Sequence, residues 1–323
     1  MKRENETTVS EFLLQGLPIP PEQQGLFFTL FLVMYLATVV GNLIIILLIR
    51  MDSRLHTPMY FFLSALALTD VSFSSVTVPK MLVDMQSNHK SISYAGCMSQ
   101  MYFFIWFGSL DNFLLAVMAY DRYVAICQPL HYTTIMRQER CISLVTISCL
   151  LCCFHSLLHT LLLVQVSFCA DIAIPHFFCD LTALLKMSCS DISLNELVIF
   201  VEGGLIFSLT FFSIMASYVH IWATVLRNPS CKKFVKVLST CGSHLLVVAL
   251  YYGTIADVYF FSSSSVSSSK EIAASVMYMI VTPMLNPFIY SLRNRDVKHA
   301  LKLFVNKMKF CKSDNLILIF YEI

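Results

Sequence analysis

Charged and amide side chains interrupt several long apolar stretches of this chain. Asp70 and Asp111 each lie near the middle of such a stretch, as do Asn42 and Asn286. A carboxylate in apolar surroundings needs a cation, a proton or polar partners. Two acids without a base therefore favour a bound cation such as Na⁺ or a shared proton. A hydrogen-bonded polar core without an ion fits the same residues equally well.

A second charged feature, Asp121 and Arg122, follows the third apolar stretch directly. Asp111 and Arg122 are eleven residues apart, about three helical turns, so they share a helix face. One interpretation is a switch, in which Asp121 holds the guanidinium until the helices part. The other is an arginine that extends to the membrane boundary and only marks it. Spacing alone favours the boundary marker.

Two histidine patterns could bind a metal, although packed or hydrogen-bonded histidines are the favoured interpretation. His155 and His159 are four residues apart on one helix face, but a third ligand is missing from the sequence pattern. The segment from His176 to Cys179 and Asp180 is the other pattern, and it competes with a disulfide at Cys179. We find neither a glycine-rich phosphate loop nor a convincing nucleophile–base pair, so we expect no enzyme.

The elements that carry these residues are membrane spans. The 323-residue chain is 57% hydrophobic and only 13% charged, with a mean hydropathy of +0.71. A soluble domain carries about 25% charged residues, so we predict an integral membrane protein. The apolar segments that reach the roughly 20 residues of a span are 27–49, 58–80, 98–121, 141–164, 197–222, 238–261 and 272–292. In the last, Pro283 and Pro287 predict a bent helix, a typical hinge.

The orientation follows from the basic residues. With the N-terminus outside, most of the 22 Lys and Arg residues fall on the cytoplasmic side. The glycosylation sequon at Asn5 would then be on the outer face. Four of the twelve cysteines would also lie outside, where an even number predicts two disulfides in one of three pairings. These four are Cys97, Cys169, Cys179 and Cys189.

Five motifs along the chain resemble those of vertebrate olfactory receptors, which are rhodopsin-like G-protein-coupled receptors. They are LHTPMYFFL from Leu55, MAYDRYVAIC from Met118, Ser217-Tyr218, STCGSH from Ser239, and PMLNPFIY from Pro283 followed by SLRN. The resemblance covers about residues 10 to 310, and the long second outer loop is similar to that of the tetrapod-type receptors, class II. It implies an all-α bundle of seven transmembrane helices.

The resemblance also implies roles for single residues. It implies the disulfides Cys97–Cys179 and Cys169–Cys189. It implies an amphipathic cytoplasmic helix after span seven, along which Val297, Leu301, Phe304 and Met308 form an apolar stripe. The activation switch and G-protein contact would comprise Asp121, Arg122, Tyr123, Tyr218, Asn286, Pro287 and Tyr290, and we expect Na⁺, if present, at Asp70 and Asp111.

An odorant pocket is implied between spans three, five, six and seven, and helical register places its residues. They are Phe104, Ile105, Gly108, Ser109, Glu202, Ile206, Tyr252, Ile255, Tyr259, Met279 and Ile280. The set is mostly apolar, which suits a small, volatile, hydrophobic ligand. Glu202 is the outlier: it either contacts a polar odorant or bonds to a neighbouring span.

We therefore expect an odorant receptor in the plasma membrane of olfactory sensory neuron cilia. Its partners would be a small odorant, a stimulatory (olfactory-type) heterotrimeric G protein that raises cyclic AMP, and the lipid bilayer, but no nucleic acid. The expected division is an extracellular N-terminus (1–26), a seven-helix domain (27–292) and a cytoplasmic helix and tail (293–323). The alternatives are a non-olfactory chemosensory receptor of the same fold, or a transporter, which the absence of an inverted repeat disfavours.

Overall fold

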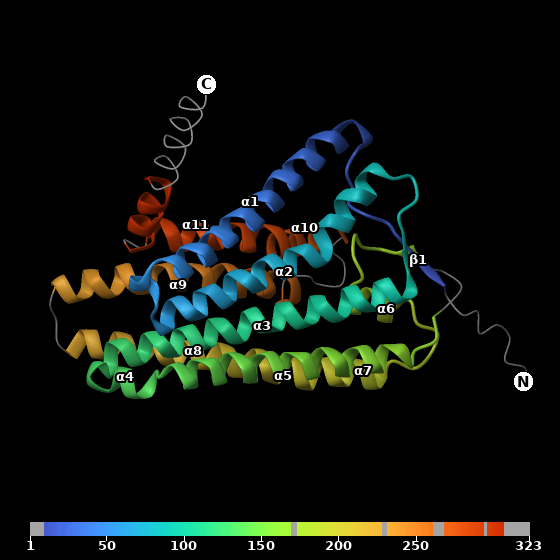
Figure 1. Ribbon diagram of the computed structural model, residues 1–323. Helices are drawn as coiled ribbons and strands as arrows, with labels where there is room; N and C mark the ends of the chain where they lie inside the picture. The colour runs from blue at the N-terminus through green and yellow to red at the C-terminus, as the bar shows by residue number, and fades with distance from the viewer. Residues whose placement is uncertain (1–9, 169–172, 228–230, 261–267, 294–295, 307–323) are drawn as a thin grey trace, which may run out of the picture.

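The chain folds into a bundle of long helices (Figure 1). The computed structural model describes residues 10–168, 173–227, 231–260, 268–293 and 296–306. The spans are α1 (Gln24–Met51), α2 (Pro58–Gln86), α3 (Tyr94–Cys127), α5 (Gln138–Val164), α7 (Ser193–Val198) with η4 (Ile199–Gly203) and α8 (Gly204–Arg227), α9 (Cys231–Phe260), and α10 (Ser268–Val276) with η5 (Met277–Val281) and α11 (Thr282–Arg293). Each coincides with one predicted apolar segment.

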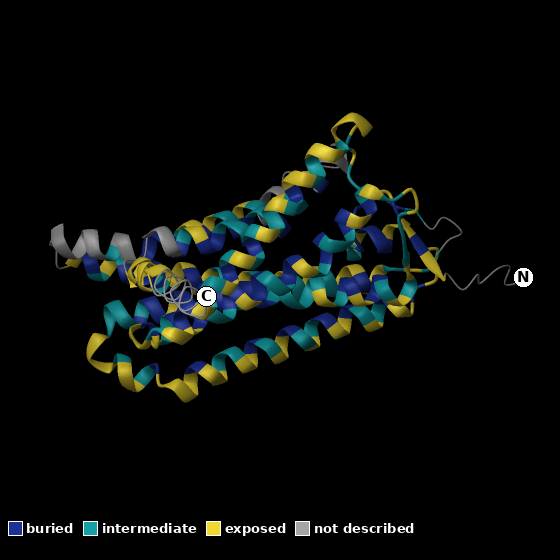
Figure 2. Ribbon diagram, turned by 45° about the horizontal axis from the view of Figure 1, so that its top comes forward, coloured by how far each residue is buried: buried dark blue, intermediate teal, exposed yellow. Residues whose placement is uncertain are grey.

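The helices are built for a lipid environment. In the described part of the chain, six helical stretches are long and apolar enough to cross a membrane, and α9 adds another long helix. Exposed positions, in yellow, follow the outward faces of these helices (Figure 2). Many of the exposed residues are large and apolar, for example Phe154, which is 65% exposed, and Phe200, which is 80% exposed. Exposed apolar faces are unfavourable in water but favourable in the hydrocarbon core of a membrane. Helices are stable there because each satisfies its own backbone hydrogen bonds.

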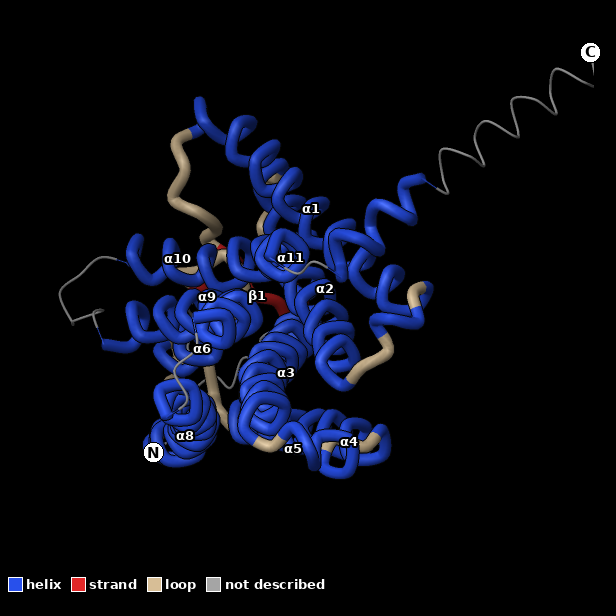
Figure 3. Tube along the Cα trace, turned by 90° about the vertical axis from the view of Figure 1, so that its left-hand side faces the viewer, coloured by secondary structure: helices blue, strands red, loops and turns tan. Residues whose placement is uncertain are grey.

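Helix α3 is the centre of the bundle. It contacts α2, α5, α8 and α9 (Figure 3), and its side chains Leu114, Leu115 and Met118 are buried in the largest apolar cluster. The helix begins where the Ser93 hydroxyl accepts a hydrogen bond from the Gly96 amide at 3.1 Å, an N-cap. The candidate site residues on α3 therefore face other helices on several sides.

A small sheet joins the N-terminal segment to two loops. Strand β1 (Glu11–Leu14) pairs antiparallel with β2 (Ser91–Ser93) and parallel with β3 (Ala173–Ile174). The buried ring of Phe12 packs edge-on against Phe168, with centroids 5.2 Å apart. This sheet lies at the same end of the bundle as α6 (Leu181–Lys186) (Figure 1). No strand was predicted here.

Short helical turns make most of the remaining connections: η1 (Pro21–Gln23), η2 (Ser53–Leu55), η3 (Pro129–His131) and α4 (Tyr132–Ile135). Beyond α11, residues 296–306 are helical, as expected for the helix after span seven. Val297 is buried in the main cluster, and Leu301 and Phe304 pack against it. The apolar stripe thus contacts the bundle itself, while Met308 lies outside the described residues.

Candidate functional site

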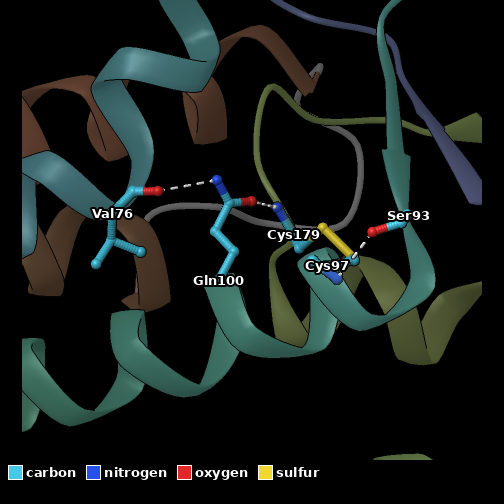
Figure 4. Close-up of a disulfide and its surroundings, with 6 residues drawn as sticks. Val76, Ser93, Cys97, Gln100 and Cys179 are labelled. Carbon is cyan, nitrogen blue, oxygen red and sulfur yellow. Dashed lines mark hydrogen bonds between the residues drawn. A yellow bond between two sulfur atoms is a disulfide. The ribbon is translucent and has the colours of Figure 1, made fainter.

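A disulfide organises the end of the bundle that carries the sheet (Figure 4). Cys97 of α3 is bonded to Cys179, with Cα atoms 5.5 Å apart, as the resemblance implied. Next to it, the Gln100 side-chain amide donates to the Val76 carbonyl at 3.1 Å and accepts from the Cys179 amide at 2.9 Å. This end of α3 is therefore tied to both α2 and the second loop. Cys169, of the other implied bridge, lies outside the described residues.

The predicted pocket residues fall into several packing groups. The ring of Phe104 packs at a tilt against Phe178 of the second loop, with centroids 4.8 Å apart. Phe104 also packs against a cluster that holds Met279 and Ile280, both buried. Ile105 packs instead on the cluster around the disulfide. Ser109 and Ile206 are half-buried. The side chains of Ile255 and Tyr259 lie outside the described residues.

Gly108 has a close neighbour. A Cβ at this position would stand 2.7 Å from the Tyr278 hydroxyl, so only glycine lets this tyrosine lie against α3. The Tyr251 hydroxyl donates to the Gly108 carbonyl at 2.9 Å. The backbone of α3 is thus in direct contact with spans six and seven at the predicted pocket.

Tyr252 follows Tyr251 on α9 and connects this helix to α3 and α8. Its hydroxyl donates to Oδ1 of Asn112 on α3 and lies 3.2 Å from the Thr210 hydroxyl on α8. The rings of Phe207 and Phe211 flank it, with centroids 5.1 and 5.2 Å away. Asn112 and Thr210 are functional candidates that sequence reasoning missed, because single polar residues in apolar spans do not show which partner they meet.

The mid-bundle polar residues do meet. The Asn286 amide donates to both carboxylate oxygens of Asp70, at 3.0 and 2.9 Å. Asp111 lines the same small cavity, together with Tyr251 and Thr282. Asp111 Oδ1 and Asn286 Oδ1 are buried and have no hydrogen-bond partner among the described residues. The cavity is thus rich in oxygen acceptors, the ligand type that hard cations prefer. Asn42 instead donates to the backbone carbonyl of Pro283, at 3.2 Å.

At the other end of α3, Asp121 and Arg122 are both buried. Arg122 Nη2 lies 3.7 Å from Asp121 Oδ2, and it has no hydrogen-bond partner within the described residues. Asp121 Oδ1 accepts from the Tyr132 hydroxyl of α4 at 2.8 Å. Burial and the neighbouring Asp121 carboxylate raise the pKa of Tyr132, so its hydroxyl stays a donor. Tyr123 lies beside this pair, and its hydroxyl accepts from Gln128 at 3.2 Å.

His244 of α9 connects three helices near Arg122. Its Nε2 lies 3.1 Å from the Leu115 carbonyl, which can only accept, so Nε2 carries the proton. Nδ1 then accepts from the Tyr218 hydroxyl at 2.7 Å. Tyr218 is therefore engaged with α9 in this arrangement, whereas the buried Tyr290 hydroxyl has no partner in the part of the chain that is described. Sequence reasoning quoted the His244 motif but gave the residue no role.

Glu202 is paired with the fourth span. Both of its carboxylate oxygens lie 2.7 Å from His155 Nδ1, and Oε2 lies 3.2 Å from His159 Nε2. Of the two roles considered for Glu202, the bond to a neighbouring span is present. Glu202 is thus a third potential ligand beside the histidine pair. The sequence pattern did not reveal it, because it does not show which acid of span five faces span four.

Comparison with known proteins agrees with these features. A family model described as olfactory receptor matches residues 31–307. Human olfactory receptor 1J4 is 67% identical over 307 residues, which cover 95% of this chain and 98% of the relative. Human olfactory receptor 1J2 is 65% identical over 305 residues, with 94% and 97% covered. Mouse olfactory receptor 1E16 is 59% identical over 312 residues, with 97% and 98% covered. The chain belongs to the olfactory receptor family.

Membership fixes the broad function of the receptor. It is a multi-pass membrane protein with the seven-helix fold of G-protein-coupled receptors, and it responds to odorants rather than catalysing a reaction. Coupling to a G protein is implicit in membership of this family.

Proposed function

We propose that this receptor binds a small, mainly hydrophobic odorant in the half of the bundle that carries the disulfide, and activates a stimulatory, olfactory-type G protein at the Arg122 end. Cyclic AMP would rise as a result. The proposed ligand contacts are Phe104, Ile105, Gly108, Ser109, Ile206, Tyr252, Ile255, Tyr259, Met279 and Ile280, with Glu202 at the border towards span four.

One observation carries the proposal: a series of hydrogen bonds along one face of α9. His244, Tyr251 and Tyr252 are spaced i, i+7 and i+8, so they share a face. Each bonds to α3, at the Leu115 carbonyl, the Gly108 carbonyl and the Asn112 side chain. A ligand that displaces Tyr252 therefore acts on α9, whose His244 is bonded to Tyr218 of α8. It shifts the equilibrium only by its differential affinity for the two arrangements.

The switch proposal concerns Arg122. In the arrangement described, its guanidinium is buried beside Asp121, and Tyr218 is bonded to His244. Movement of α9 breaks the Tyr218–His244 bond and frees this hydroxyl for Arg122. Asn286, Pro287 and Tyr290 on α11 would supply the bend, since a proline inside a helix removes one backbone hydrogen bond.

We also propose Na⁺ in the mid-bundle cavity. Two acids, Asp70 and Asp111, line it, and Asp111 Oδ1 and Asn286 Oδ1 have no partner among the residues described. A monovalent cation would supply the missing partner for these oxygens and offset the repulsion between the carboxylates.

The proposed topology has the disulfide end outside the cell, because disulfides persist in oxidising compartments. Residues 1–26 would then be extracellular and glycosylated at Asn5, residues 27–292 would form the receptor domain, and residues 293–323 would be cytoplasmic. The proposed location is the plasma membrane of olfactory sensory neuron cilia.

The test is an odorant panel applied to cells that express the receptor and a cyclic AMP reporter. We expect a concentration-dependent signal from wild type and none from Arg122→Ala at equal surface labelling. An undiminished signal from surface-expressed Arg122→Ala would refute the switch, and odorant responses that proceed without cyclic AMP would refute the stimulatory coupling.

A further inference from the structure

Three potential metal ligands converge between spans four and five. His155 and His159 lie one turn apart on α5, and Glu202 lies in the π-helical turn η4. The ligand atoms of the three residues all lie within 4.8 Å of one another. Both imidazoles direct a nitrogen to the same carboxylate oxygen, Oε2, at 2.7 and 3.2 Å. The three side chains therefore already point to one place.

The geometry is close to that of a transition-metal site. Nitrogen and oxygen ligands about 2.0–2.2 Å from a tetrahedral Zn²⁺ stand roughly 3.4 Å from one another. The two imidazole–carboxylate distances of 2.7 and 3.2 Å are near this value. The imidazole planes cross at 88°, with centroids 4.7 Å apart, so the rings do not block each other. Small side-chain rotations bring all three groups around one ion.

The position of Glu202 favours a ligand role over simple packing. The π-helical turn η4 interrupts span five at this residue, and such turns occur frequently at functional sites. The flanking residues Phe200 and Val201 are largely exposed on the bundle surface. An acid among lipid-facing residues needs a partner, and its side chain is only partly enclosed, at 30% exposure.

We propose that His155, His159 and Glu202 bind one divalent transition-metal ion of the Zn²⁺ class and so link spans four and five. Two imidazoles and one carboxylate are the ligand set of several zinc sites, with the fourth position open to water. The Glu202 carboxylate only accepts, so the imidazole nitrogens that face it carry protons before the ion binds. On binding, each of these protons leaves to solvent and the other ring nitrogen takes one up, so both imidazoles remain neutral ligands. The two hydrogen bonds to Glu202 are replaced by metal–ligand bonds. No bond to carbon changes and no redox step occurs.

The other histidine motif does not compete for this role. The Cys179 sulfur is bonded to Cys97, so it cannot act as a thiolate ligand. His176 packs against the rings of Phe177 and Phe178, with centroids 4.8 and 4.4 Å away. Within the described residues, the cluster on spans four and five is the group of three that converges on one point.

The test uses purified full-length receptor in lipid nanodiscs, titrated with Co²⁺ as a coloured probe and then with Zn²⁺. We expect one Co²⁺ per receptor, with the visible absorption of a four-coordinate site that Zn²⁺ displaces, and a higher thermal unfolding midpoint on binding. His155→Ala and Glu202→Gln should each lower the affinity at least tenfold. His89→Ala, an exposed histidine outside the cluster, is the matched control and should bind as wild type does.

Folding of each variant is checked by its elution as a single species and by cooperative unfolding without metal. If Glu202→Gln fails this check, His155→Gln replaces it. Wild type that binds no Co²⁺ at 100 μM, or binding that survives in both cluster variants, would overturn the proposal. The readout is independent of odorants and of G protein, so it distinguishes failure of this metal site from failure of the receptor function.

Discussion

His244 illustrates how single residues hold the described arrangement. It is almost fully buried, and both of its ring nitrogens are used, one by the Leu115 carbonyl and one by the Tyr218 hydroxyl. Burial of such a group is favourable only when its polar atoms have partners. The residue therefore stabilises the contact of α9 with α3 and α8, and it engages the Tyr218 hydroxyl that we propose to meet Arg122.

Replacing His244 by Phe is expected to raise ligand-independent cyclic AMP. The change removes two hydrogen bonds and leaves the buried Tyr218 hydroxyl without its acceptor, at a cost of about 1–3 kcal/mol to the described arrangement. One or two kcal/mol corresponds to a roughly five- to thirty-fold shift in equilibrium. The measurement is basal reporter signal normalised to surface receptor.

The companion variant is Tyr218→Phe, which loses the same bond but also the hydroxyl proposed to meet Arg122. We expect a raised basal signal with a reduced odorant response. Basal signals equal to wild type in both variants would show that this bond does not restrain the receptor.

The mid-bundle acids lead to a second residue-scale prediction. If Na⁺ occupies the cavity beside Asp70 and Asp111, replacing choline chloride by NaCl at constant ionic strength should raise the thermal unfolding midpoint of the purified receptor. Asp111→Asn should abolish the difference, because it removes one of the two charges. If NaCl raises the midpoint of Asp111→Asn as much as that of wild type, the ion binds elsewhere. If NaCl does not raise the midpoint of wild type, the proposal of a bound Na⁺ is refuted.

At the scale of elements, the spans were predictable because bilayer thickness sets the length of an apolar helix. The segment predicted at 141–164 and the helix Gln138–Val164 differ by only three residues at one end. Contacts between spans were not predictable in the same way. The π-helical turn η4 alters the register of span five, and hydropathy does not reveal such a turn. The sequence therefore could not show which neighbouring span Glu202 faces. Likewise, β1 is four residues long, too short for a periodicity signal.

Helix packing gives a prediction on α1. A Cβ at Gly41 would lie 3.0 Å from Pro287 Cγ on α11, whereas Gly25 of the same helix has open space. Alanine normally stabilises a helix by about 0.5–1 kcal/mol over glycine. We expect Gly41→Ala to lower the thermal unfolding midpoint, because the rigid proline ring must move away, and Gly25→Ala to leave it equal or higher. Equal midpoints for the two variants would contradict this close packing.

At the scale of the whole molecule, the two ends of the bundle have different chemistry. The disulfide, the sheet and the aromatic cluster around Phe104 hold one end, whereas the other end carries Asp121 and Arg122. Between these ends, helix α9 makes hydrogen bonds to the middle of α3 through Tyr252 and His244, which are about two turns apart on α9. Because the connection is a helix rather than a flexible chain, we expect a displacement at Tyr252 to reach His244. This is how an odorant would act on a G protein without touching it.

The central claim is that an odorant opens the Arg122 end to a stimulatory G protein. The most direct measurement is guanine-nucleotide exchange on purified olfactory-type stimulatory α subunit, with βγ, by purified receptor in nanodiscs, with and without an odorant that is active in cells. We expect odorant-accelerated exchange, which is lost in Arg122→Ala and much weaker with an inhibitory α subunit. Exchange that is unaffected by odorant, or equally fast in Arg122→Ala, would contradict it.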